Sequence, residues 1–115
     1  MEQNKNTLIQ FNNYGMGHGD EALALKLAGN YFQLLMDDDR LPKIITFYNA
    51  GVKLLHEDSP VVKVLKEIES KGVVLLACKT CLNYYNMQDQ LAVGVPGTMM
   101  DIITLQANAT KVITI

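Results

Sequence analysis

The 115-residue sequence contains no tryptophan, only two cysteines and only three prolines. No apolar run approaches the roughly 18 residues that a membrane-spanning helix requires, so we expect no transmembrane segment. The net charge is −2 and no basic patch is visible, which argues against nucleic acid as a partner. No second cysteine pair is present, and two cysteines supply only half of the usual ligand set of a structural zinc site.

The first residues, Met1 to Asn6, lack the basic start and the apolar core of a signal sequence. We therefore expect a cytoplasmic protein, in which nearby thiols are reactive or metal-binding more often than bridged. Hydrophobic residues make up 49% of the chain and charged residues 19%, which is typical of a folded globule. The length suits one domain, so residues 1–115 are expected to form a single domain.

Apolar runs alternate with amphipathic segments along the chain, which predicts alternating strands and helices. Strands are expected at Thr7–Phe11, Lys43–Tyr48, Val73–Ala77, Ala92–Val95 and Lys111–Ile115. Helices are expected at Asp20–Met36, Pro60–Lys71, Leu82–Asn86 and Met99–Ala107. This alternation implies an α/β fold with a mostly parallel sheet that is covered on both faces.

Capping signals set some of the helix ends. Ser59 is a good N-cap residue and Pro60 suits the first helical position. Gly72 can take the left-handed conformation that ends a helix. Thr98, with Asp101 three residues later, matches a capping box before the last helix.

The two cysteines, Cys78 and Cys81, directly follow the apolar run Val73–Ala77. The carboxyl edge of a parallel sheet is where ligands bind in open α/β folds. A following helix N-terminus and the neighbouring Lys79 both favour a thiolate, which is the attacking form of cysteine. The pair is therefore the main candidate for chemistry.

Four interpretations of the pair stay open. A zinc site would require that the fold happens to bring His18 and His56 close to the two cysteines, so that four ligands surround one metal ion. A thioredoxin-like dithiol has the right strand–helix context, but only 34 residues follow Cys81. As a nucleophile, Cys78 would hold a transferred sulfur as a persulfide, with Cys81 as a resolving thiol or a bystander. Alternatively, Cys78 is a small apolar residue of the core.

Further candidates for substrate binding lie in segments expected at the same edge of the sheet. The loop after the first strand contributes Gly17 and His18, and His18 could act as an acid, a base or a charge partner. The segment after the second strand contributes Asn49, Gly51 and Lys53.

Asn49 could hydrogen-bond a substrate, and Lys53 could stabilise a thiolate or persulfide anion. Lys79 and Thr80, between the two cysteines, complete the set of substrate-binding candidates. We expect neither a cofactor nor a resident metal.

An ordered set of segments along nearly the whole chain carries a resemblance to a known family. They are Gly15-Met16-Gly17-His18-Gly19-Asp20-Glu21, Phe47-Tyr48-Asn49-Ala50-Gly51-Val52-Lys53-Leu54, Ser59-Pro60, Lys71-Gly72-Val73 and Ala77-Cys78-Lys79-Thr80-Cys81-Leu82-Asn83-Tyr84-Tyr85. With these segments the chain resembles the DsrE-like family, and within it the C-terminal domain of the YedF-type sulfurtransferase-like proteins.

The resemblance implies a three-layer α/β/α sandwich with a five-stranded sheet, assembled as a dimer, trimer or hexamer. In the sulfur-relay members the active cysteine follows the third strand, which is the position of Cys78. Such members accept sulfur as a persulfide from a small TusA-like carrier protein. We therefore expect a sulfurtransferase or sulfur carrier with a persulfide on Cys78. The alternatives are a non-catalytic oligomeric binding module and a thiol–disulfide oxidoreductase that uses both cysteines.

Overall fold

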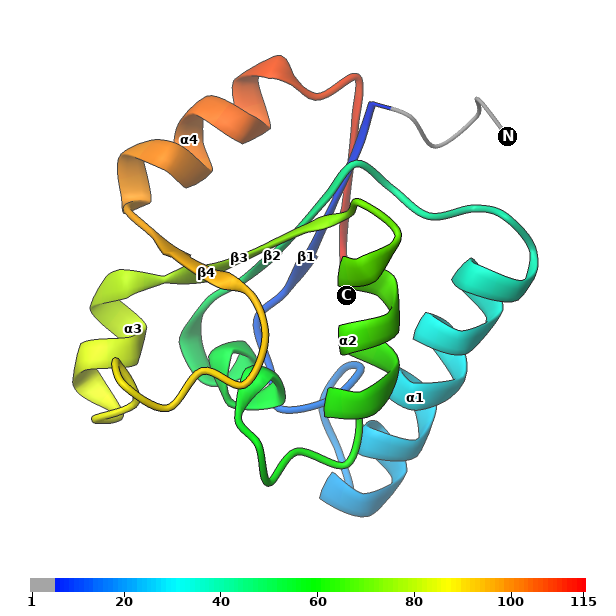
Figure 1. The fold of residues 1–115 in the computed structure, drawn as a ribbon, viewed down its shortest axis with the longest axis horizontal. Coiled ribbons are helices and arrows are strands. Elements are labelled where there is room, and N and C mark those ends of the chain that lie inside the picture. The colour runs from blue at the N-terminus through cyan, green and yellow to red at the C-terminus, as the bar shows by residue number, and fades with distance from the viewer. Residues whose placement is uncertain (1–5) are drawn as a thin grey trace.

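Strands and helices alternate through residues 6–115, the part of the chain that the computed structural model describes (Figure 1). The strands are β1 (Thr7–Phe11), β2 (Ile44–Phe47), β3 (Val74–Cys78), β4 (Val95–Gly97) and β5 (Lys111–Thr114). The helices are α1 (Glu21–Asp37), α2 (Val62–Ser70), α3 (Lys79–Tyr84) and α4 (Met99–Asn108), together with the 3-10 helix η1 (Asn49–Leu55).

The five strands form one parallel sheet in the order β4-β3-β2-β1-β5. From β1 to β4 the chain steps in one direction across the sheet, and it then reverses to reach β5. Because crossovers between parallel strands are right-handed, this reversal places α4 on the face opposite to α1 and α2. Figure 1 shows these helices on either side of the strands. The predicted three-layer α/β/α sandwich is confirmed, and all of its strand pairs are parallel.

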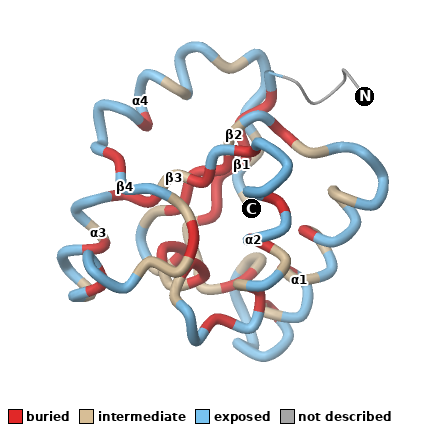
Figure 2. The backbone as a smooth tube through the Cα atoms, in the orientation of Figure 1, coloured by how far each residue is buried: buried red, intermediate tan, exposed pale blue. Residues whose placement is uncertain are grey.

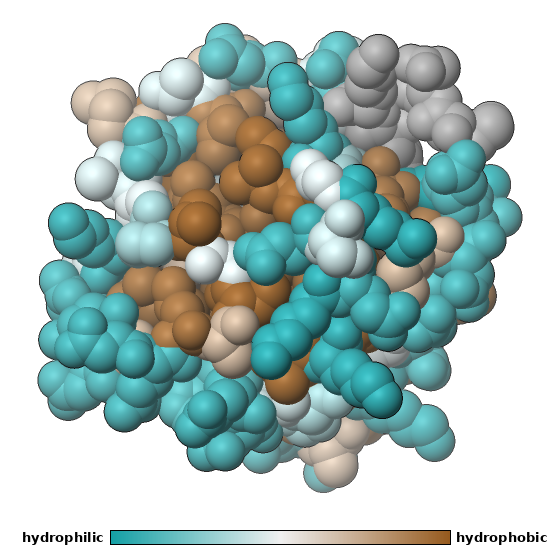
Figure 3. Space-filling model, in the orientation of Figure 1, coloured by the Kyte–Doolittle hydropathy of each residue, from teal (hydrophilic) through white to brown (hydrophobic). Residues whose placement is uncertain are grey.

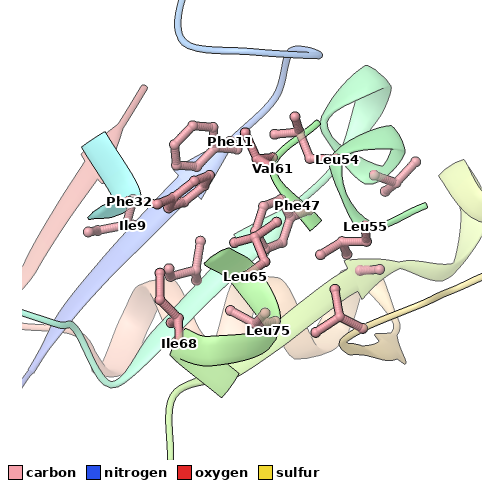
Figure 4. Close-up of a cluster of buried hydrophobic side chains, with 14 of the residues drawn as sticks. Ile9, Phe11, Phe32, Phe47, Leu54, Leu55, Val61, Leu65, Ile68 and Leu75 are labelled. Atoms are coloured by element: carbon pink, nitrogen blue, oxygen red, sulfur yellow. The ribbon is translucent and has the colours of Figure 1, made fainter. Parts of the chain in front are cut away.

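The main core lies between the sheet and the helices α1 and α2 (Figure 4). Phe11 of β1 packs against Phe32 of α1 with ring centroids 4.7 Å apart, and against Phe47 of β2 at 5.9 Å. Leu65 and Ile68 of α2 are fully buried in the same cluster. Burial of these large apolar side chains supplies most of the driving force for folding, at roughly 25 cal/mol per Å².

Two of the predicted capping features are confirmed and one is wrong. Thr98 and Asp101 form the reciprocal capping box, and Gly72 has a φ of 95°. However, α2 begins at Val62, and its N-cap position is held by Val61 rather than by Ser59. The Ser59 hydroxyl instead accepts a hydrogen bond from the Val61 N–H at 3.2 Å, so it stabilises the turn that leads into the helix.

The segment after β3 also differs from the prediction. The predicted helix Leu82–Asn86 lies at Lys79–Tyr84, so it begins directly after Cys78 and contains Cys81. The predicted strand Ala92–Val95 lies at Val95–Gly97, because Val93 is buried and Gly94 turns with a φ of 88°.

One face of the molecule carries exposed apolar side chains. Ile102 is the buried residue of α4, and the outer positions of this helix are pale blue in Figure 2. Figure 3 shows brown apolar side chains gathered over the strands beside α4. Exposed members of this surface, called the β4–α4 patch below, are Val74, Val95, Met99, Met100 and Ile103.

Among residues 6–115, no helix has the length and apolar character that crossing a membrane would require.

Candidate functional site

The site forms where the carboxyl ends of β2 and β3 meet. These strands are parallel neighbours, with Phe47 opposite Ala77 at their last shared position. β2 leads into η1 and β3 leads into α3, and these two short helices pack against each other. Adjacent parallel strands therefore bring Asn49 beside the cysteine pair, although Asn49 and Cys81 are 32 residues apart in sequence.

The two cysteines are free thiols with different environments. Cys78 is the last residue of β3, is 1% exposed and belongs to the core cluster. Cys81 is partly exposed on α3. It faces an open pocket of about 400 Å³, whose lining residues are Asn49, Thr80, Cys81, Tyr84 and Tyr85. Solvent and solutes therefore reach Cys81 directly, whereas Cys78 lies behind it.

The sulfur of Cys81 has a backbone hydrogen-bond donor. The N–H of Asn49 lies 3.0 Å from Sγ, and Asn49 holds this position with a left-handed φ of 52°. Burial raises the pKa of the Cys81 thiol, a hydrogen bond with the Cys78 side chain raises it further, and the Asn49 N–H opposes both. The net pKa is higher than that of an ordinary cysteine, so the expectation of a favoured thiolate is wrong for Cys81.

A second pocket, of about 490 Å³, adjoins the first along Tyr85. Its lining residues are Tyr14, Glu21, Lys53, His56, Asp58, Ser59, Tyr85, Met87 and Gln90. The Nζ atom of Lys53 lies 4.4 Å from the centroid of the Tyr85 ring, a cation–π contact that holds both side chains. Tyr85 is therefore the wall between an uncharged pocket at Cys81 and a charged pocket at Lys53.

His56 has a structural role in this region. Its Nδ1 atom accepts a hydrogen bond from the Asp58 N–H at 3.0 Å, so in the neutral ring Nε2 carries the proton that is donated to Gln90 Oε1 at 3.1 Å. His56 thus links η1 to the loop before β4. Within residues 6–115, no three His, Cys, Asp or Glu side chains are grouped closely enough to hold a metal ion.

The structure brings some of the predicted site residues together. Asn49 and Thr80 line the Cys81 pocket, and Lys53 lines the adjoining one. Lys79 is exposed on the first residue of α3 and is not part of either lining. Gly51 has a packing role, because an added Cβ would lie 2.2 Å from the carbonyl oxygen of Phe11.

Gly17 and His18 lie apart from this group in the loop between β1 and α1. His18 is exposed, and neither residue belongs to the described lining of the two pockets. Gly17 has a φ of 79° with open space around it, which a tight turn explains.

Sequence reasoning missed one feature of the site. It assigned Asn49 to the substrate, whereas the backbone N–H of this residue contacts Cys81. Tyr84 and Tyr85 were not among the substrate-binding candidates, and both line the Cys81 pocket as an apolar wall. The sequence did carry a signal for the Asn49 contact: an asparagine directly follows a strand, and asparagine adopts positive φ more readily than most residues.

Comparison with known proteins gives a consistent picture. A family model described as DsrE/DsrF-like family matches residues 5–115. No curated protein matches the sequence.

Three solved structures share the fold. The ychN protein from E. coli has 20% sequence identity and a TM-score of 0.66, covering 96% of this chain and 99% of its own. The protein of unknown function MTH1491 from Methanobacterium thermoautotrophicum has 23% identity and a TM-score of 0.71, with the same coverage of both chains. The conserved protein of unknown function BT1422 from Bacteroides thetaiotaomicron has 17% identity and a TM-score of 0.66, covering 96% of this chain and 95% of its own. At these identities the likeness concerns the fold alone.

Proposed function

The chain belongs to the DsrE/DsrF-like family, which is generally related to sulfur relay, and we propose that it is a sulfurtransferase or sulfur carrier that forms a persulfide on Cys78. The observation that carries the proposal is the pair of free thiols at the carboxyl end of β3, one buried and one facing a pocket. Transfer of a sulfane sulfur requires only a thiolate that attacks and a thiolate that leaves, so two neighbouring cysteines are sufficient.

The burial of Cys78 suits storage of the sulfur. A persulfide on an exposed thiol is open to attack by other thiols, because thiol exchange depends on access to the sulfur. At 1% exposure, Cys78 is shielded by the surrounding core residues. A sulfur atom held there is lost only when a specific partner or a local opening reaches it.

The test is the mass of the intact protein after treatment with a low-molecular-weight persulfide. We expect the wild type to gain one sulfur atom that a reductant removes. In the Cys78→Ala variant, we expect no sulfur that is shielded from attack by other thiols. If Cys78→Ala gained as much sulfur as the wild type and held it for as long, a persulfide on Cys78 would be contradicted. Absence of any gain in the wild type would favour a non-catalytic binding module, a function that the burial of Cys78 also accommodates.

We further propose that the protein self-associates through the β4–α4 patch, as a dimer, trimer or hexamer. Several exposed large apolar side chains on a sheet edge and the helix beside it are typical of protein interfaces. A TusA-like carrier protein as the sulfur donor stays a prediction from the family resemblance.

A further inference from the structure

We infer that Cys81 is the receiving thiol, which takes the sulfur from the donor and passes it inward to Cys78. This inference rests on the proposed function and assigns Cys81 a catalytic role in it. Two observations carry it: the different exposure of the two thiols, and their positions at the N-cap and in the first turn of α3.

Access decides which thiol meets the donor. Cys81 lines the pocket at the surface, and Cys78 is not among the residues that line it. With 1% of its surface exposed, Cys78 can meet a donor directly only after the protein opens locally. A donor that enters the pocket therefore contacts Cys81 first.

The positions of the two cysteines on α3 decide where the sulfur goes next. Cys78 is the N-cap residue of α3 and Cys81 is in the first turn of that helix, so the two side chains lie on the same side of it. A persulfide on Cys81 therefore lies on the same side of α3 as the buried thiol of Cys78. Transfer between the two sulfurs then needs no diffusing intermediate.

The backbone N–H of Asn49 serves both steps. It donates to the Cys81 sulfur at 3.0 Å and stabilises that atom when it carries negative charge. Cys81 is the nucleophile of the first step and the leaving group of the second, so the same hydrogen bond assists attack and departure. Cys78, the final holder, does not need this donor.

The two steps balance without an oxidant or a reductant. In the first, the Cys81 thiol gives up its proton and attacks the outer sulfur of a persulfide R–S–SH. The S–S bond of the donor breaks, and R–S⁻ leaves with the bonding electrons and takes up the proton as R–SH. Cys81 then carries –S–SH. In the second, the Cys78 sulfur gives up its proton and attacks the outer sulfur on Cys81. The S–S bond on Cys81 breaks, its electrons stay on Cys81 Sγ, and that atom takes the proton, so that Cys78 carries –S–SH and Cys81 regains a thiol.

The lining of the pocket indicates which end of the donor enters. Its side chains come from Asn49, Thr80, Cys81, Tyr84 and Tyr85, none of which is charged. Lys53 lies against the Tyr85 ring and lines the adjoining pocket. The geometry therefore suits the compact sulfur end of a small thiol persulfide, with any larger charged end of the donor directed past Tyr85.

The experiment measures persulfide formation with glutathione persulfide as the donor, by rapid alkylation and peptide mass mapping. We expect the wild type to accumulate sulfur on Cys78 and the Cys78→Ala variant to accumulate it on Cys81. In Cys81→Ser, loading of Cys78 should slow by about tenfold or more, because Cys78 then reacts only through local opening.

The outcomes separate this inference from the proposed function. Loading of Cys78 at the wild-type rate in Cys81→Ser, or no sulfur on Cys81 in Cys78→Ala, overturns the relay while leaving sulfur handling intact. No sulfur on either cysteine of the wild type overturns the proposed function itself. A measurement on the unmodified protein guards against misfolded variants: iodoacetamide should label Cys81 before Cys78, and the reverse order would overturn the inference.

Discussion

The backbone N–H of Asn49 donates a hydrogen bond to the Sγ atom of Cys81 at 3.0 Å. This contact joins η1, which follows β2, to α3, which follows β3. It depends on a left-handed φ of 52° at Asn49, a conformation that few residues other than glycine, asparagine and aspartate adopt. Backbone geometry outside the cysteine motif therefore sets the environment of the accessible thiol.

Asn49→Val should strain this backbone, because a β-branched residue is poorly tolerated at positive φ. We expect a loss of about 1–3 kcal/mol in the free energy of unfolding, measured by urea denaturation. Asn49→Gly is the matched control: glycine accepts the same φ and keeps the N–H, so alkylation of Cys81 should continue at the wild-type rate. An unchanged stability in Asn49→Val would show that the conformation carries no strain.

The raised pKa of Cys81 predicts a pH dependence of its reactivity. Because only the thiolate is alkylated, the rate should keep rising with pH beyond the range in which an ordinary cysteine levels off. The rate of iodoacetamide labelling of the Cys81 peptide, followed by mass spectrometry from neutral to alkaline pH, checks this. A plateau already reached near neutral pH would contradict it.

The raised pKa of Cys81 also makes the free energy of unfolding depend on pH. The folded protein retains the thiol proton at a pH where the unfolded chain has lost it. The contribution of Cys81 to stability is therefore fully present below the unfolded pKa, roughly 8.5, and is lost as the pH rises through the folded pKa. Burial likewise raises the pKa of Tyr14 and of Tyr31, which adds to the loss at still higher pH. The midpoint of urea unfolding should fall on the alkaline side, and a rise there would contradict the assignment.

Gly51→Ala should be strongly destabilising, because the new Cβ would lie 2.2 Å from the Phe11 carbonyl oxygen. We expect a loss of about 3 kcal/mol in the free energy of unfolding, since the clash is with backbone that cannot move aside. Gly29→Ala, in α1, is the control. The new Cβ would lie 3.6 Å from the Cγ1 atom of Val61, which is an ordinary van der Waals contact. Replacing a helical glycine should leave stability unchanged or raise it by about 0.5–1 kcal/mol. Equal effects of the two substitutions would show that η1 does not press against β1.

Ile103→Asp should dissociate the proposed assembly, because it places a charge on the β4–α4 patch where Ile103 is 51% exposed. Light scattering should report a smaller particle than for the wild type. The control is Leu34→Asp, since Leu34 is 63% exposed on α1, outside the patch. A wild-type protein that is monomeric at working concentration would contradict the proposed interface at the β4–α4 patch.

Most of the fold could be predicted from local patterns. The mainly apolar runs of β1, β2 and β3 and the capping box at Thr98 each report a structure that neighbouring residues determine. The exact start of α2 could not be predicted in this way, because Ser59 and Pro60 suit a turn as well as a helix start. β4 was displaced because Gly94 takes positive φ while its N–H donates to the Glu69 side chain on α2, a contact that sequence periodicity does not show.

By itself, the sequence determined the alternation of strands and helices and the position of two cysteines three residues apart at the end of an apolar strand. Those features are local, since they depend on side-chain periodicity and spacing. Only the tertiary structure decided that Cys78 is buried, that Cys81 faces a pocket, and that the Asn49 N–H reaches its sulfur. The physical reason is that exposure and hydrogen bonding depend on how η1 packs against α3, which is a contact between segments far apart in the chain.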